Sequence, residues 1–345
     1  MINYSQQSIN EADIKAVTDA LRSPMLTTGP RVSEFEKKFA KKVGAKHAVS
    51  FSNGTSALYF SMRAAHIEPG DEVIVPAMTF CATATAVKYM GGTPVFADVN
   101  PDTLLIDAED VKRKITDKTK AVVTVDYAGQ KCELKTDLPL ISDSCHSLIH
   151  HEDALVSCHS FHPVKHITTG EGGMITTDSG TWSSVARSFR NHGRVDGEMY
   201  TLGNNYRMSD IQAALGVSQL RKLDYFMLRR GSIALEYDIA FKGIKGITPL
   251  KRIRDRAHSN HLYVIKVDGD RDKFREHLAE NGIGTQIHYD PPVHLQPYYR
   301  GFGNKDGDCP DAEKVSKQIV SIPCYPDLSD QQQNHIIETI KQYFQ

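Results

Sequence analysis

The chain has 345 residues, of which 40% are hydrophobic and 24% charged, and its formal net charge is -1. This length can bury one large core or two domains, so an enzyme of ordinary size is the first expectation. The charge near zero and the absence of a long Lys/Arg run argue against binding to nucleic acid or to an anionic membrane surface. No stretch resembles a signal peptide or a membrane span, and we therefore expect a soluble cytoplasmic protein.

The cysteines fit the same expectation. They lie mostly beside apolar or strand-like segments, and none has CxxC spacing, so reduced and packed thiols are favoured over a disulfide framework. The six positions are Cys81, Cys132, Cys145, Cys158, Cys309 and Cys324.

Two helices are expected near the start of the chain. The first is predicted to begin after Asn10, a typical N-cap residue, and to end before Pro24. Ser33 and Glu36 have the spacing of a capping box, which predicts that the second helix opens there and ends at Gly44.

Short apolar strands then alternate with helices up to about residue 180. Continuous apolar strands of this kind indicate a mainly parallel sheet that is covered on both faces, with ligands bound at the carboxyl ends of its strands. The expected strands are His47–Ser52, Glu72–Pro76, Thr93–Val99, Ala121–Tyr127, Leu138–Ser142 and Gly173–Thr177.

A change of pattern divides the rest of the chain. A long helix, Ser209–Arg230, is predicted to end in a solvated pair of arginines, and a smaller α+β unit follows it. We therefore expect a large domain at 1–235 and a small domain at 236–345, with a hinge in or after the long helix. The small domain is expected to contain strands at His261–Val267, Thr285–Tyr289 and Ser321–Cys324 and helices at Arg271–Asn281 and from Asp327 onward.

The stretch from Ser160 to Gly173 carries the first functional indication. Its glycines permit a sharp turn and a close backbone approach, and Pro163 stiffens the segment that presents Lys165. A lysine in a confined site can be kept neutral and can then act as a nucleophile, and the hydroxyl of Ser160 can bind a phosphate. Taken alone, a glycine-rich stretch of this kind is more often a surface loop with an ordinary lysine.

Two further patterns suggest a phosphate site and a charged partner beside it. Thr55 and Ser56 open a helix directly after a strand, where free backbone N–H groups and hydroxyls can bind an anion, although Ser and Thr cap many helices. Asp143 ends a predicted strand and His146 follows it, so the carboxylate can hold a pyridinium N–H; a turn-forming aspartate is the alternative. Phe80 lies at the mouth of another helix.

Histidines and cysteines also gather between residues 145 and 166, which raises the question of a metal site. Their spacing fits no common zinc pattern and spans a strand, a turn and the lysine loop, and we therefore expect no metal.

Five motifs occur together in this chain, namely Gly54-Thr55-Ser56, Phe80, Asp143-x-x-His146, Ser160-x4-Lys165 and Asn205-Tyr206-Arg207-Met208. Together they resemble the DegT/StrS family of pyridoxal-phosphate sugar aminotransferases, from about residue 33 to residue 299. The segment from Ser160 to Lys165 is most similar to the branch that aminates UDP-4-keto-6-deoxy sugars on the way to pseudaminic acid. The resemblance implies the α/β architecture of fold type I aminotransferases.

The resemblance also implies roles around the cofactor, pyridoxal 5'-phosphate. Lys165 would bind the cofactor covalently and then move a proton between the amino donor and the cofactor. Asp143 would pair with the pyridine nitrogen, Phe80 would stack on the ring, and His146 would lie near the ring hydroxyl.

The cofactor phosphate would be shared between two chains. Thr55, Ser56 and Ser160 would bind it from one subunit, and Asn205 would reach it from the neighbouring subunit. The resemblance therefore implies a homodimer with shared active sites.

The implied reaction transfers an amino group from L-glutamate to a nucleotide-linked 4-keto-6-deoxy sugar, of which UDP-4-keto-6-deoxy-N-acetylhexosamine is our first expectation. His288 and Tyr289 lie in a segment similar to the family's small-domain substrate segment. The alternatives are a dTDP-keto-sugar aminotransferase of another amino-sugar pathway and a non-catalytic regulatory relative. The retained Lys165 speaks against the second alternative and against the family's dehydrases, which carry histidine there.

The sequence departs from the family's pattern in two places. The segments 130–138 and 143–165 are shorter than is usual, although every motif residue is present. We expect these deletions to alter the surface around the substrate mouth rather than the cofactor site.

Overall fold

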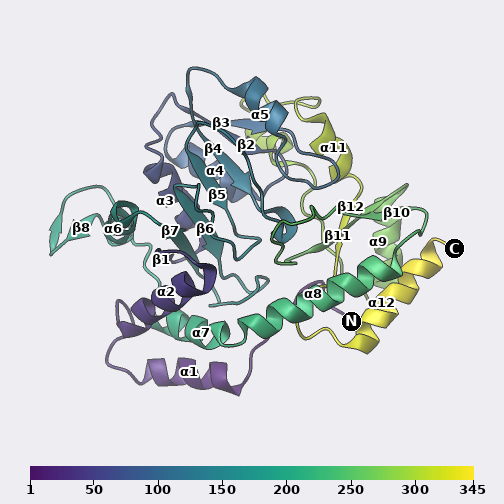
Figure 1. Cartoon of the computed structure of the whole chain (residues 1–345), viewed down its shortest axis with the longest axis horizontal. Coiled ribbons are helices and arrows are strands. Elements are labelled where there is room, and N and C mark those ends of the chain that lie inside the picture. Colours follow the sequence, from purple (N-terminus) through teal and green to yellow (C-terminus); the bar gives the residue numbers. More distant parts are fainter.

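A seven-stranded sheet forms the centre of the structure, a computed structural model that describes residues 1–345 (Figure 1). The strands are β1 (His47–Phe51), β2 (Glu72–Pro76), β3 (Thr93–Ala97), β4 (Thr119–Val125), β5 (Leu140–Asp143), β6 (Val156–Ser160) and β7 (Gly173–Thr177). Their order is β1-β7-β6-β5-β4-β2-β3, and only β7 runs antiparallel to its neighbours. The mainly parallel sheet expected from the alternating pattern is confirmed.

Helices cover both faces of this sheet. In β1, for example, Val49 packs into the main core together with α3, whereas Ala48 packs into a second cluster on the opposite face together with α2. The helices of this part are α1 (Glu11–Leu21), α2 (Pro30–Val43), α3 (Gly54–Ala64), α4 (Cys81–Tyr89), α5 (Ala108–Lys114) and α6 (Gly180–Phe189), with a 3-10 turn at Tyr127–Gly129.

The second helix begins earlier than its capping-box pattern predicted. Its N-cap is Gly29, and Pro30 occupies the first helical turn, where proline's fixed φ favours helix entry. Ser33 and Glu36 therefore lie inside α2. Glu36 is buried and binds Arg187 at 2.6 Å and Arg190 at 2.5 Å, so a side chain expected to cap a helix holds α2 against α6 instead.

The predicted long helix is two helices, α7 (Asp210–Leu220) and α8 (Leu223–Ala240). Because α8 continues well beyond the two arginines, the expectation of a solvated helix end was wrong. Arg230 is 1% exposed, and its Nη1 donates to the carbonyl oxygens of Asn260, His261 and Cys324.

A smaller antiparallel sheet lies beyond α8, with the order β10 (Ile247–Pro249), β11 (Tyr263–Val267) and β12 (Ile319–Ile322). It packs with α8, α9 (Arg271–Glu280) and α12 (Asp330–Tyr343) around its own apolar cluster. The remaining elements are a hairpin, β8 (Arg194–Val195) with β9 (Glu198–Met199), the short helices α10 (Pro297–Arg300) and α11 (Pro310–Ser316), and a 3-10 turn at Val293–Leu295.

The strand expected at residues 285–289 does not form. Only Gln286 makes a backbone bridge, to Ser321. The Nδ1 of His288 is hydrogen-bonded to the hydroxyl of Ser321 at 2.8 Å. Side-chain bonding thus replaces a continuous ladder along this segment.

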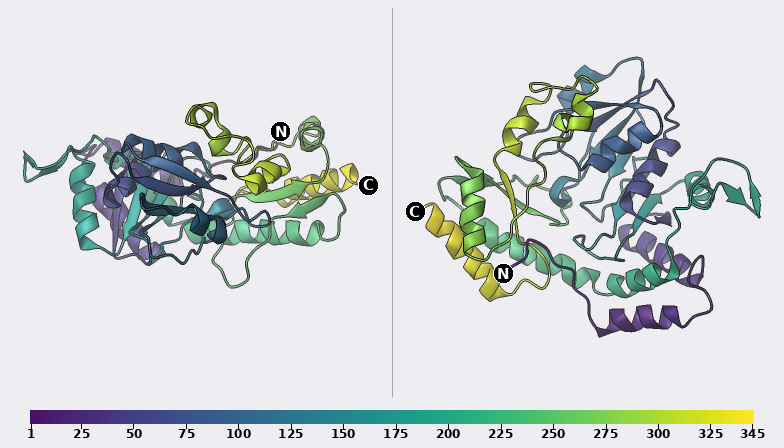
Figure 2. Two further views of the ribbon diagram at one scale, coloured as in Figure 1. Left: turned by 90° about the horizontal axis from the view of Figure 1, so that it is seen from above. Right: turned by 180° about the vertical axis from the view of Figure 1, so that it is seen from behind.

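Both chain termini lie beside the smaller sheet (Figure 2). Ile2 belongs to the apolar cluster of that sheet and bridges Ile283. The first residues of the chain therefore pack with the small unit formed by its last part. None of the helices has the length and apolar character that crossing a membrane requires.

Candidate active site

The carboxyl ends of β1, β2, β5 and β6 meet at one edge of the large sheet, since these strands run in the same direction. The sequence after each of these strands carries one of the predicted site residues. Asp143 is the last residue of β5 and Ser160 the last residue of β6, while α3 begins just after β1. The topology therefore places the sequence motifs near one another.

The loop that carries Lys165 is folded back on itself. The Phe161 N–H donates to the carbonyl of Gly172 at 2.9 Å, and the Thr169 N–H donates to the carbonyl of Phe161 at 3.0 Å. A Cβ atom on Gly173 would lie 2.2 Å from the carbonyl oxygen of Asn53, so only glycine allows the loop to meet the start of α3.

Lys165 is placed where a neutral amine is favoured. Burial of its ammonium group lowers its pKa below the ordinary value, and the neighbouring Cys145 and Asp143 oppose that shift only in part. A lysine with a lowered pKa has the unprotonated fraction that nucleophilic attack requires.

Asp143 is buried and held by two donors. Its Oδ2 accepts from the hydroxyl of Thr83 at 2.7 Å, and its Oδ1 accepts from the N–H of Cys145 at 3.1 Å. Thr83 is itself 2.7 Å from the hydroxyl of Thr79. Sequence reasoning missed Thr83, whose only signal was its position in the first turn of the helix that follows Phe80.

A group of imidazole rings surrounds the lysine. The Nε2 of His146 lies 3.2 Å from the Tyr289 hydroxyl, and its buried Nδ1 has no partner. Its ring centroid is 4.6 Å from that of His261, which in turn is 5.4 Å from that of His166. Burial, with Lys165 as the next cause, lowers the pKa of His146 well below its usual value, so the ring is neutral.

His166 and His261 were not predicted as site residues, since they come from distant parts of the sequence. They are brought together by Ser259, a buried residue of the segment before β11. The Ser259 N–H donates to the carbonyl of Gly129 at 2.8 Å, and its own carbonyl is 2.9 Å from His166 Nε2. Its hydroxyl also accepts from the N–H of Leu148 at 3.4 Å.

The start of α3 provides a cradle of donors. Asn53 caps the helix by accepting from the N–H of Ser56 at 2.8 Å, and the Ser56 hydroxyl lies 3.1 Å from that of Ser52. A Cβ on Gly54 would lie 3.1 Å from the Cβ of Ser160, so the two motifs are in contact range. Thr55 is exposed at the same helix end, and the arrangement suits an anionic phosphate.

The segment at His288 and Tyr289 lies over this edge of the sheet. The ring of Tyr289 is 6.0 Å from that of Phe80, which caps α4 and is 55% exposed. The His288 carbonyl accepts from the Tyr127 hydroxyl. Burial, with Lys165 as the second cause, lowers the pKa of His288 to about 3, so this ring is also neutral.

The side chain of Asn205 is exposed and makes no hydrogen bond to the other predicted site residues. Its backbone bridges Asn191. Close by in sequence, Arg207 helps to line a cavity of about 210 Å³ together with Arg187 and Arg190. Since Glu36 is the only acidic residue that lines this cavity, positive charge predominates there.

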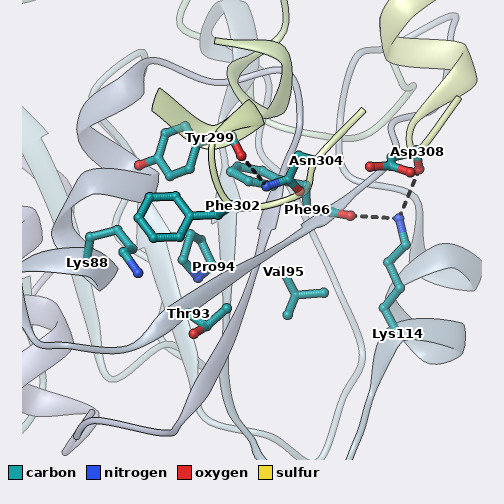
Figure 3. A pocket seen from close by; sticks show the side chains of 10 residues that line it. All are labelled: Lys88, Thr93, Pro94, Val95, Phe96, Lys114, Tyr299, Phe302, Asn304 and Asp308. Carbon is teal, nitrogen blue, oxygen red and sulfur yellow. Dashed lines mark hydrogen bonds between the residues drawn. The ribbon is translucent and has the colours of Figure 1, made fainter. Parts of the chain in front are cut away.

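A separate cavity of about 390 Å³ lies between β3 and the segment around α10 (Figure 3). Its polar groups are largely satisfied: Lys114 Nζ donates to the Phe96 carbonyl at 2.7 Å, and Asn304 donates to the Tyr299 carbonyl at 2.9 Å. None of the predicted site residues lines this cavity. The structure also contains no group of three His, Cys, Asp or Glu side chains arranged to hold a metal ion.

A mainly parallel sheet with one reversed strand, a lysine of lowered pKa after β6 and a carboxylate at the end of β5 define a fold type I pyridoxal-phosphate-dependent enzyme. The residues fit this cofactor, since a phosphate cradle, an amine nucleophile, a buried carboxylate and the unpartnered Nδ1 of His146 surround one place. The chain belongs to the DegT/DnrJ/EryC1/StrS aminotransferase family, whose sequence profile matches residues 7–341. It is a pyridoxal-phosphate-dependent sugar aminotransferase.

Two relatives characterise the similarity in sequence. The spore coat polysaccharide biosynthesis protein SpsC of Bacillus subtilis is 37% identical, with 98% of this chain and 96% of SpsC covered. The UDP-4-amino-4-deoxy-L-arabinose–oxoglutarate aminotransferase of Shewanella sediminis is 33% identical, with 97% of this chain and 96% of that protein covered. The alignment with SpsC runs over 376 positions, more than the length of this chain, so the longer relative carries insertions.

Two solved structures show the same fold over the full length. The sugar aminotransferase Spr1654 of Streptococcus pneumoniae, described as putative and solved with pyridoxal phosphate, has a TM-score of 0.93 at 30% identity, with 99% of this chain and 98% of that chain covered. PseC of Helicobacter pylori, an aminotransferase of pseudaminic acid biosynthesis, has a TM-score of 0.91 at 33% identity, with 99% of both chains covered.

Proposed function

We propose that the enzyme transfers the amino group of L-glutamate to the ketone of a nucleotide-linked 4-keto-6-deoxy sugar, with UDP-4-keto-6-deoxy-N-acetylhexosamine as the first candidate. The similarity to PseC and to a UDP-sugar aminotransferase supports a UDP-linked substrate. The oxoglutarate in the name of the second relative supports glutamate as the donor, since oxoglutarate is what glutamate becomes when it loses its amino group.

The observation that carries the proposal is the lowered pKa of Lys165 beside the buried carboxylate of Asp143. When bound, pyridoxal phosphate supplies a protonated ring that withdraws electrons from a carbon losing its proton. The carboxylate of Asp143, fixed at the end of β5 by Thr83 and by the Cys145 N–H, is placed where it can hold that ring nitrogen protonated.

Lys165 is assigned two tasks, covalent attachment of the cofactor and transfer of a proton through its Nζ. Both tasks need an amine that is neutral for part of the cycle, which its burial favours. His146 is assigned to the edge of the cofactor ring. Because its Nε2 meets the Tyr289 hydroxyl and its Nδ1 is unpartnered, it has one nitrogen free for a further hydrogen bond.

Thr55, Ser56 and Ser160 are assigned to the cofactor phosphate, with the N–H groups at the start of α3 as additional donors. Phe80 is assigned to the face of the ring. Its exposed side chain has the freedom to lie against a planar group that enters the site.

His288 and Tyr289 are assigned to the sugar side. They lie opposite Phe80 and His146, and both side chains remain partly exposed towards the site. A neutral imidazole and a phenol are suitable hydrogen-bonding partners for sugar hydroxyls, and their aromatic faces help to exclude water.

A homodimer with shared active sites is part of the proposal. Asn205 is exposed and free to reach a phosphate on a neighbouring subunit, and the arginine-lined cavity near it offers the cations that a diphosphate requires. We assign residues 1–235 to the large cofactor domain and residues 236–345 to the small domain that carries His288 and Tyr289.

A substrate panel tests the proposal directly. The purified enzyme is supplied with pyridoxal phosphate, L-glutamate and each of several UDP- and dTDP-linked 4-keto sugars, and the products are identified by mass spectrometry. We expect the amino-sugar product from the UDP-linked 6-deoxy-N-acetylhexosamine. Preference for a dTDP sugar would reject the nucleotide assignment, and lack of oxoglutarate formation would reject the donor.

A further inference from the structure

Helix α8 carries a stripe of exposed apolar side chains that the catalytic site does not use. Tyr225, Leu228, Leu235 and Ile239 are between 58% and 76% exposed. In Figure 1 the helix runs along the lower side of the molecule between α7 and α12. We refer to these four residues, together with the exposed Ser232 at their centre, as the α8 stripe.

The spacing of the α8 stripe is that of a helix seam. Its five positions follow one another at intervals of three, four, three and four residues, which is the a/d pattern of a coiled coil. The core-facing side chains of the same helix, Phe226, Arg230, Ile233 and Tyr237, lie on the other side. Four large apolar residues in one line on a solvent face mark an interaction surface, whereas singly scattered ones do not.

We propose that the α8 stripe pairs with the same stripe of a second copy of this chain, antiparallel and about a two-fold axis at Ser232. The ends of the stripe coincide in that arrangement and its inner positions are offset by one residue, which approximates the self-complementary pattern that an isologous interface requires. Tyr225 of one copy would face Ile239 of the other, and Leu228 would lie one residue from the position opposite Leu235, an offset of about 1.5 Å along the helix. Ser232 is small enough for the two helices to approach at the centre.

The charges beside the stripe favour an antiparallel arrangement. Glu236 and Lys242 form no ion pair within the chain and are exposed. About the axis at Ser232, position 236 lies opposite position 228, so Glu236 comes within one residue of Arg229 of the other copy. Lys242, two residues beyond the end of α8, comes within two residues of Asp224. Long side chains can span these offsets, so opposite charges are within reach of each other on both sides of the seam. Arg229 and Asp224 already pair with Asp330 and Lys42, respectively, and the incoming charges extend those pairs.

This contact is distinct from the dimer proposed through Asn205, and it does not depend on the enzyme's substrate. Asn205 lies between α6 and α7, before the chain reaches α8. A chain that uses both contacts assembles beyond a dimer. An 18-residue helix is about 27 Å long, which is enough for the whole stripe to be covered by a second copy.

The first test measures the mass of the cofactor-loaded protein in solution by sedimentation equilibrium and compares wild type with variants of the α8 stripe. Leu228→Glu combined with Leu235→Glu places like charges opposite each other in the seam, and we expect the assembly to fall to half its mass, with association weakened roughly a hundredfold or more. Phe302→Glu, at another exposed aromatic residue, is the matched control and should leave the mass unchanged. Equal masses for wild type and double variant would overturn the proposal.

The second test uses disulfide cross-links to find which residues of the two copies lie close together, and it does not depend on the double variant. Chains carrying Leu228→Cys and chains carrying Leu235→Cys, one of them tagged, are mixed and oxidised mildly. The antiparallel seam predicts a disulfide between the two different chains in preference to disulfides between like chains. The wild-type protein, whose exposed thiol is Cys81, is the control for unrelated cross-linking. A preference for like pairs, or no cross-link above the control, would contradict the proposed seam.

Discussion

Asp143→Asn tests the electrostatic core of the proposed mechanism with almost no change of shape. The Asn side chain retains one oxygen to accept from Cys145, and the Thr83 hydroxyl can rotate to accept from the new amide, so the local fold should persist. What is lost is the negative charge opposite the ring nitrogen. Any rate effect therefore reports the charge rather than the packing.

The magnitude follows from the burial of this carboxylate, which is 4% exposed. Two opposite unit charges about 4 Å apart attract each other by about 4 kcal/mol at an effective dielectric constant of about 20. The amide recovers part of this as a neutral hydrogen bond, leaving about 3 kcal/mol. That corresponds to a loss of roughly a hundredfold in rate.

The assay is the half-reaction with L-glutamate, followed by the change in absorbance of the bound cofactor in a single turnover. Thr83→Val is the matched control, because it removes one donor to Asp143 and retains the charge; we expect a loss of about tenfold or less. A rate for Asp143→Asn within about threefold of wild type would mean that Asp143 is a turn residue and would refute the reasoning.

Four further predictions address other parts of the site. Borohydride treatment of the loaded enzyme should label Lys165, and Lys165→Ala should bind the cofactor without turnover; a label on another lysine would reject this assignment. In the cofactor-free protein, the pKa of Lys165 is lower in the folded chain than in the unfolded chain, so the unfolded chain binds more protons between the two pKa values. The free energy of unfolding should therefore rise with pH from the lowered pKa towards 10.5. Lys165→Met should abolish this rise, as measured by urea titration at each pH. Asn205→Ala and Lys165→Ala chains, each nearly inactive, should regain activity when mixed, because a hybrid dimer has one intact site; no recovery after proven subunit exchange would place each site within one chain. His288→Ala should slow the half-reaction with keto sugar and spare the one with glutamate, and equal slowing of both would indicate a structural role.

The parts of the site that the sequence predicted are those set by local patterns. A strand followed by a small polar turn and a helix is recognisable without a structure, and this pattern led to Gly54, Thr55 and Ser56. The end of a predicted strand led to Asp143, and the glycine-rich stretch led to Ser160 and Lys165. The contacts beyond one element could not be read in this way. Thr83 holds Asp143 across 60 residues, and Ser259 meets His166 across 93 residues.

Two of the local errors have the same physical origin. Ser33 and Glu36 match a capping box, but Pro30 opens the helix first, and the buried Glu36 binds two arginines at the end of α6. Arg230 resembles the charged end of a helix, yet its Nη1 donates in the interior to carbonyl oxygens of segments that flank the small sheet. In both cases a tertiary partner decided the role of a charged residue whose local pattern suggested another.

The position of Ser259 limits how this enzyme can be re-engineered. Its backbone and hydroxyl join the turn after β4, the segment after His146 and the lysine loop to the segment that leads into β11, the central strand of the small sheet. A swinging motion of the small unit would have to break all of these bonds together, so sugars should enter past Phe80 and Tyr289 rather than through a gap between the units. Exchange of substrate segments between relatives should therefore succeed when residues 257–262 stay with the large unit they are bonded to, and only residues after β11 are replaced.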